Sequence, residues 1–224
     1  MRIAEIFYSV QGEGSLVGVP SIFVRTSGCN LRCSWCDTPY TSWNPEGEDL
    51  SIGEILGRAA AFSAAKHVVL TGGEPMIAPA IVELSERFRE RGLHITVETA
   101  GTVFAPVACD LMSISPKLSN STPEGVFRAH HERLRQRPDV LLRLVAEYDY
   151  QLKFVIARED DITEVCAVVS QLQTPAGKVI LMPEGISAEV LRERAVWLAE
   201  ICKRYGFRLS PRLHVDLYGN RRGV

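Results

Sequence analysis

Three cysteines stand close together near the start of the chain, in the run Cys29-Asn-Leu-Arg-Cys33-Ser-Trp-Cys36. Three thiolates this close cannot all pair as disulfides, and soft sulfur ligands suit a metal centre. The other cysteines, Cys109, Cys166 and Cys202, are scattered, which is typical of small core residues and not of a disulfide framework. The spacing therefore predicts a metal centre held by the first three.

Two kinds of centre are open to three clustered cysteines. A closed structural zinc site, as in an interaction module, needs four ligands. No fourth cysteine or histidine lies nearby in sequence, because the first histidine is His67, so a zinc site would need a distant ligand. A cubane held by three cysteines instead leaves one iron without a protein ligand. That open iron can chelate the amino and carboxylate groups of S-adenosylmethionine (SAM).

The spacing of the cysteines, with three and then two residues between them, resembles the motif of the radical SAM superfamily. A second run, Val68–Pro75, ends in Gly-Gly-Glu-Pro and resembles the GGEP motif of the same superfamily. The resemblance implies a [4Fe–4S] cluster on Cys29, Cys33 and Cys36, which transfers an electron to SAM and so forms a 5′-deoxyadenosyl radical. It also implies SAM contacts, which would come from Gly73 and from Trp35, Cys36 and Asp37.

Short apolar runs that alternate with helical patterns must position these motifs. The runs lack a clean polar alternation, as strands covered on both faces do. The predicted strands are Ser21–Thr26, His67–Leu70, Ile95–Glu98, Leu111–Ser115, Leu152–Ile156, Lys178–Met182 and Phe207–Leu213. The predicted helices are Ser51–Ala65, which opens on a Ser51/Glu54 capping box, then Ala78–Arg91, Asp161–Leu172 and Ser187–Tyr205, with Pro123–Tyr150 helical after an irregular start.

This alternation predicts an α/β fold with a parallel sheet and helices outside it. Eight strand–helix units need about 250 residues, and this chain has 224. We therefore expect a single domain over residues 1–224, built as a partial, incomplete TIM-like (β/α)6 barrel of the radical SAM type with about six strands. Both motifs follow strands, so they fall at the carboxyl ends where such folds place their chemistry.

The composition disfavours some classes of binding partner. The net charge of −2 and the pI near 6.2 show no global basic field, which disfavours nucleic acid as a main partner. The apolar runs are far too short to span a membrane. The start, Met1-Arg2-Ile3-Ala4-Glu5, lacks the layout of a secretory signal, so we expect a cytoplasmic protein.

Further short motifs resemble one particular family within this superfamily. The chain resembles the 7-carboxy-7-deazaguanine synthases, a radical SAM family, from Glu5 to its end. The resemblance rests on Gln11-Gly12-Glu13-Gly14, Cys36-Asp37-Thr38, Val97–Gly101, Ser115-Pro116-Lys117 and Leu217–Val224. It implies ring contraction of 6-carboxy-5,6,7,8-tetrahydropterin, on the way to queuosine and other 7-deazapurines. Hydrogen would leave C6, the ring would rearrange, ammonia would be lost and SAM would be regenerated.

The same resemblance implies further cofactors and partners. Mg²⁺ would be held by Thr38 together with substrate oxygens, which are the hard ligands that this ion prefers. A flavodoxin or a ferredoxin would supply electrons, and the enzyme would be a homodimer. A glycyl-radical activase is the alternative radical SAM enzyme. It would share the cysteine loop and the GGEP-type turn but would not need Gln11–Gly14, Arg25 or Ser115–Lys117.

The residue types suit a flat, anionic pterin. Arg25 can pair bidentately with its carboxylate, although a strand-surface salt bridge is the alternative. Glu13 can accept from the N–H groups of the pyrimidine edge. A carboxylate at the end of an apolar strand is costly unless it is paired, so Glu98 is expected to face a ligand. The substrate contacts predicted are Val10, Gln11, Gly12, Glu13, Arg25, Thr71 and His214, the last placed in the final strand. Beyond the cysteine loop and Gly73, the SAM contacts predicted are Glu98, Ser115, Pro116, Lys117, Met182 and Gly185.

Overall fold

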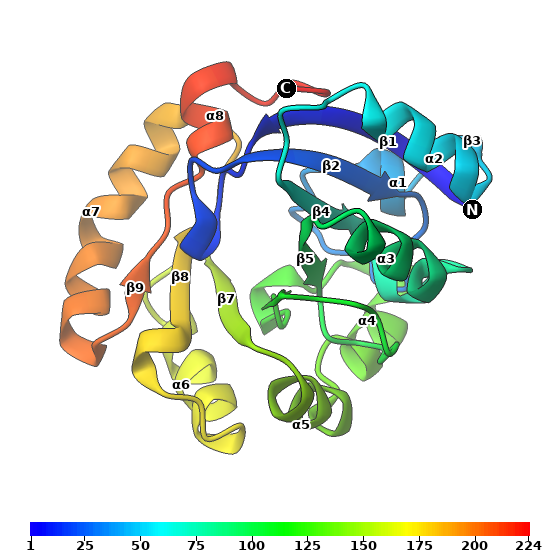
Figure 1. Cartoon of the computed structure of the whole chain (residues 1–224). Helices are drawn as coiled ribbons and strands as arrows, with labels where there is room; N and C mark the ends of the chain where they lie inside the picture. Colours follow the sequence, from blue (N-terminus) through cyan, green and yellow to red (C-terminus); the bar gives the residue numbers. More distant parts are fainter.

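A single mixed sheet organises the chain, and the computed structural model describes all of it, from Met1 to Val224. Its nine strands are ordered β3-β1-β2-β4-β5-β6-β7-β8-β9. The sheet curls without closing, and most helices cover its outer face (Figure 1). The strands are Arg2–Val10 (β1), Pro20–Thr26 (β2), Glu48–Asp49 (β3), His67–Gly72 (β4), His94–Thr99 (β5), Leu111–Ile114 (β6), Tyr150–Ile156 (β7), Val179–Pro183 (β8) and Arg208–Leu209 (β9).

The expected partial barrel is confirmed. From β2 to β9 every pairing is parallel, and β2 with β4–β8 form six strands of four or more residues. Most of their apolar side chains are buried, as the absence of polar alternation predicted; Val24, Leu70 and Val97 are 0% exposed. Parallel strands all end on the same side, so the loops that follow β2, β4, β5, β6 and β8 meet at one end of the barrel.

The helices follow the predicted patterns closely. The Ser51 hydroxyl accepts from the Glu54 amide and the Glu54 carboxylate accepts from the Ser51 amide, so the capping box is present. The segment Pro123–Tyr150 is helical after an irregular start, as expected. No helix is both long and apolar enough to cross a bilayer. The helices are Pro39–Ser42 (α1), Ile52–Ala60 (α2), Ile81–Glu90 (α3), Arg128–Leu134 (α4), Pro138–Glu147 (α5), Asp161–Gln171 (α6), Ala188–Tyr205 (α7) and Leu213–Tyr218 (α8).

The prediction of a purely parallel sheet is wrong at the amino-terminal edge. Strand β1 pairs antiparallel with β2, and β3 pairs antiparallel with β1. Most β1 side chains are only partly buried, so the strand has no continuous apolar run to mark it. A connection of only nine residues, 11–19, joins β1 to β2, which allows a hairpin but not the longer crossover that a parallel pair needs.

The predicted final strand is also too long. Only Arg208–Leu209 pairs with β8, and the last ladder-like bond runs from the Ser210 amide to the Leu181 carbonyl. Pro211 follows and has no N–H group, so it cannot continue the ladder. Helix α8 begins at Leu213, which places His214 on a helix and not in a strand.

Candidate active site

Two adjoining cavities lie at the carboxyl ends of the strands. The larger has a volume of about 470 Å³ and the smaller about 120 Å³. Trp35, Asp37, Thr38, Gly73 and Lys117 line both, so the two form one continuous site. The predicted cysteines line the smaller cavity, and almost all other predicted site residues line the larger one. Pro116 is the exception, because it is buried and lines neither.

The smaller cavity fits a three-cysteine cluster. Cys29, Cys33 and Cys36 are free thiols, and no other cysteine or histidine lines this cavity. Burial raises the pKa of Cys29 to about 12 and that of Cys33 to about 11, so a bound metal must displace their protons. No three ligand side chains converge on one point, as a single ion requires. In a cubane each cysteine binds a different iron, so three sulfurs around a cavity suit it.

Hydrogen bonds hold the cysteine loop in place. The Leu31 amide donates to the Cys29 sulfur at 3.3 Å, and Ser42 Oγ lies 3.2 Å from the Cys36 sulfur. The indole N–H of Trp43 donates to the Cys33 carbonyl at 3.1 Å. Donors to sulfur stabilise a thiolate, and the bond from Trp43 anchors the loop to the end of α1.

His131 supports this loop from α4. Its Nδ1 accepts from the Arg32 amide at 3.2 Å, and its Nε2 lies 3.0 Å from Ser121 Oγ. Burial lowers the pKa of His131 to about 4, so the ring is neutral at pH 7 and Nδ1 can accept. The segment 123–150 thus contributes a support for the cysteine loop.

Glu74 of the GGEP-type run is fully buried and joins two strand ends. Its carboxylate accepts from the Met76 amide, the Thr99 hydroxyl and the Ala100 amide, at 3.1, 2.7 and 2.8 Å. Burial raises the pKa of this carboxyl group, although the three hydrogen bonds act in the opposite direction. The preceding turn packs tightly on the cysteine loop, since a Cβ on Gly73 would lie 2.2 Å from the Gly28 carbonyl oxygen and 2.8 Å from Cys29 Cβ.

This close approach predicts the effect of Gly73→Ala. The added methyl group must push the cysteine loop away, at a cost of about 1–3 kcal/mol in the free energy of unfolding. We expect lower iron content after reconstitution and a lower melting temperature. Gly57→Ala in α2 is the matched control, because a Cβ there meets nothing within 4 Å. Equal iron content in Gly73→Ala and wild type would contradict the packing argument.

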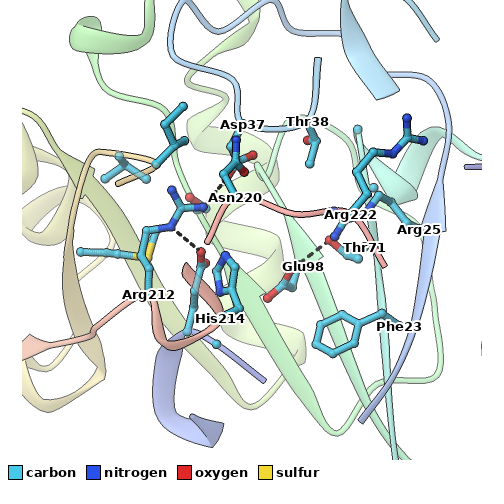
Figure 2. A pocket seen from close by; sticks show the side chains of 18 of the residues that line it. Phe23, Arg25, Asp37, Thr38, Thr71, Glu98, Arg212, His214, Asn220 and Arg222 are labelled. Atoms are coloured by element: carbon cyan, nitrogen blue, oxygen red, sulfur yellow. Dashed lines mark hydrogen bonds and ion pairs between the residues drawn. The ribbon is translucent and has the colours of Figure 1, made fainter. Parts of the chain in front are cut away.

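In the larger pocket, two predicted site residues form hydrogen bonds with a third, Glu98. Gln11 Nε2 donates to Glu98 Oε1 at 3.2 Å, and Thr71 Oγ1 donates to Glu98 Oε2 at 2.9 Å. Figure 2 shows the Thr71 bond, with Glu98 projecting into the pocket from β5. Glu98 is predicted to contact SAM, yet its partners here are both predicted substrate contacts. It therefore lies beside two residues that are predicted to contact the substrate.

Two buried cationic side chains beside Glu13 and Glu98 were not predicted from the sequence. Lys153, on β7, pairs with Glu13 and lies 3.6 Å from Glu98; Arg212 Nε donates to Glu13 at 3.1 Å. The two side chains are 6% and 8% exposed. Burial alone would raise the pKa of Glu13, but Lys153 and Arg212 hold it well below its usual range. Lys153 interrupts an apolar strand just as Glu98 does, so the same signal could have found it.

Arg25 forms a salt bridge and also lines the larger pocket. Its Nε donates to Glu5 at 2.9 Å in a salt bridge, which is the structural interpretation. Its terminal amino groups make no hydrogen bond in the structure, and its side chain lines the larger pocket. An arginine anchored through Nε presents the remaining fork to a ligand in a set orientation.

The other predicted residues take their places around the pocket wall. Lys117 donates to Ser115 Oγ at 2.8 Å and lies 5.6 Å from the centre of the Trp35 ring. His214 packs against Gly12, where an added Cβ would meet its ring. Val10, Thr38, Met182 and Gly185 line the same pocket. The carboxy-terminal segment Asn220–Val224, not predicted as part of the site, also lines it.

Comparisons with known proteins agree with this geometry. Residues 23–148 match the model of the Radical SAM superfamily. A protein of Rhodopirellula baltica named 7-carboxy-7-deazaguanine synthase is 46% identical over 230 residues, which cover 100% of this chain and 89% of that protein. One of the same name from Halobacterium salinarum is 41% identical, over 98% of this chain and 91% of its own. The crystal structure of QueE from Escherichia coli superposes with a TM-score of 0.69 at 27% identity, over 95% and 94% of the two chains.

Proposed function

Because this chain belongs to the 7-carboxy-7-deazaguanine synthase family of the radical SAM superfamily, we propose that it converts 6-carboxy-5,6,7,8-tetrahydropterin into 7-carboxy-7-deazaguanine with loss of ammonia. One observation carries the proposal: a cavity with three free cysteines opens into a larger pocket lined by an amide, carboxylates and an arginine. A bound cluster and SAM would supply the radical chemistry, and the residues of the chain bind and orient the substrate.

The polar groups of the larger pocket match the parts of a carboxypterin. Glu13, held ionised by its two cations, offers acceptors to the N–H groups of the pyrimidine edge. A carboxylate has about four acceptor positions, so two salt bridges leave room for a ligand. The free fork of Arg25 would bind the substrate carboxylate. Thr38 would hold Mg²⁺ together with substrate oxygens, beside Asp37 in the wall shared by both cavities.

Arg25→Lys tests the assignment of the carboxylate. Lysine keeps the charge but loses the planar fork, so one charge-assisted hydrogen bond worth about 1.5–3 kcal/mol is lost. We expect the KM for the pterin to rise about 10- to 100-fold, with a smaller change in kcat. Arg58→Lys, at an exposed salt bridge with Glu48, is the matched control. A KM unchanged in Arg25→Lys would place the substrate carboxylate elsewhere.

Turnover tests the proposed function directly. The protein, reconstituted with iron and sulfide without oxygen, is given SAM, Mg²⁺, a chemical reductant and 6-carboxy-5,6,7,8-tetrahydropterin. We expect ammonia and a product with the absorbance of a deazapurine, while SAM is not consumed in proportion. Absence of both products from protein that holds its cluster would reject the synthase and leave the glycyl-radical activase. Omitting Mg²⁺ from the same assay tests its proposed part.

Two partners follow from the family and not from contacts in this chain. A radical SAM enzyme needs a reductant, and we propose a flavodoxin or a ferredoxin. We also propose a cytoplasmic homodimer that supplies queuosine or another 7-deazapurine. Sedimentation of the reconstituted protein measures its oligomeric state, and a single-chain mass would reject the dimer.

A further inference from the structure

Arg212 joins three separate segments of the site. Its Nε donates to the Glu13 carboxylate at 3.1 Å, between β1 and β2. One terminal nitrogen donates to the Gly185 carbonyl at 2.6 Å, after β8, and the other donates to the Asp37 carboxylate in the cysteine loop. In Figure 2, the Arg212 guanidinium lies directly against Asp37 in the pocket wall. No other side chain bonds to all three segments.

The three partners of Arg212 are predicted to contact two different ligands. Asp37 and Gly185 are predicted SAM contacts, and Glu13 is a predicted substrate contact. We propose that Arg212 is a positioning residue that couples the binding of SAM to the binding of the pterin. The inference rests on the proposed function, because that function supplies the second ligand.

The physical basis is shared ordering. When SAM contacts Asp37 and Gly185, it restricts both segments and, through two hydrogen bonds, the guanidinium between them. The third hydrogen bond then holds Glu13 in the orientation that the pterin needs. The pterin therefore binds a carboxylate that is already ordered, and it loses less conformational entropy on binding. Coupling of this kind is reciprocal, so the pterin must tighten SAM by the same factor.

Arginine suits this position and lysine does not. A guanidinium has five N–H donors in a rigid plane and stays charged, so it can bind two carboxylates and a carbonyl at once. With a side chain only 8% exposed, its charge is balanced by Glu13 and Asp37. Lysine has three donors on one nitrogen and cannot reach three segments that diverge. Glu13 keeps Lys153 as a partner when Arg212 is replaced, so its charge is not left alone.

Equilibrium binding measures the coupling without turnover. With the cluster oxidised and no reductant present, SAM cannot be cleaved, so the Kd of SAM can be measured with and without the pterin. For wild type we expect the pterin to lower that Kd about fivefold or more. In Arg212→Met the ratio of the two Kd values should fall to nearly one, and Arg212→Lys should lose most of the effect. Arg194→Met is the matched control, because Arg194 binds only Glu184 on the same loop after β8.

Each outcome of this experiment supports or overturns the proposed coupling. A wild-type ratio of one, or an unchanged ratio in Arg212→Met, overturns the coupling even if turnover proves the synthase. Wild type that binds SAM but no pterin rejects the proposed function instead. A ratio lost equally in Arg194→Met shows that loop order in general, and not Arg212, carries the effect. Thermal unfolding and iron content check each variant. If Arg212→Lys, which keeps the charge, also fails to fold, then Arg212 is structural and the inference is overturned.

Discussion

Replacing Cys33 with alanine is expected to remove the iron–sulfur cluster and abolish turnover while the fold persists. Cys33 packs in a small group with Leu31 and Ala100, apart from the main core. Loss of one buried sulfur there costs about 1 kcal/mol, a small part of the stability of a domain. A cluster on this loop would be held by only three protein ligands, so its binding is far more sensitive than the fold to the loss of one of them. Iron and sulfide content, brown colour and turnover should therefore vanish together.

Cys166→Ala is the matched control for this experiment. Cys166 lies on α6, outside both cavities, so the control should keep iron, colour and activity. Circular dichroism at rising temperature measures the fold of both variants. Global unfolding of Cys33→Ala at room temperature would contradict the prediction, because it would make the metal a structural element. A colourless wild type with about one zinc per chain would contradict the cluster itself.

Lys153→Met is expected to destabilise the protein more than the replacement of a charged residue on the protein surface. Lys153 is 6% exposed and neutralises Glu13 and Glu98. Removing it leaves Glu98 without a nearby cation and leaves Glu13 with Arg212 alone, so we expect a loss of about 3 kcal/mol, the lower end of the range for a broken buried pair. Methionine has a similar volume, so the cavity term is small. Urea unfolding at pH 7 measures the loss. Lys178→Met, at the exposed bridge to Asp149, is the control and should cost about 1 kcal/mol or less.

The loss in Lys153→Met should also shrink in acid. In wild type the folded pKa of Glu13 lies below its usual value of 4.5, so its ionisation stabilises the fold at pH values above 4.5. In the variant that pKa rises, because burial is less opposed. The difference in unfolding free energy between the two proteins is therefore largest near pH 7. It should decrease as the pH falls through the raised pKa of Glu13 in the variant, because the protonated carboxyl group of the variant no longer needs a cation. A difference independent of pH would show that Glu13 is not the group involved.

Short-range order in the chain was enough to predict that the three cysteines lie together. They are on one loop, so their spacing in sequence is nearly their arrangement in space. The buried parallel strands could be predicted for a similar reason, because apolar runs such as Val68–Leu70 need cover on both faces. Strand β1 could not be recognised in this way, since it is partly exposed and its apolar pattern is interrupted.

Only the tertiary structure decided how the charged residues of the larger pocket pair. Lys153 meets Glu13 across 140 residues, and Arg212 meets Glu13 across 199 and Asp37 across 175. Nothing local in the sequence distinguishes Arg212 from a surface arginine. Its partners follow β1, β2 and β8, and only the path of the whole chain brings them together. Charges that pair at such separations depend on the path of the whole chain, whereas ligands on one loop depend only on their neighbours.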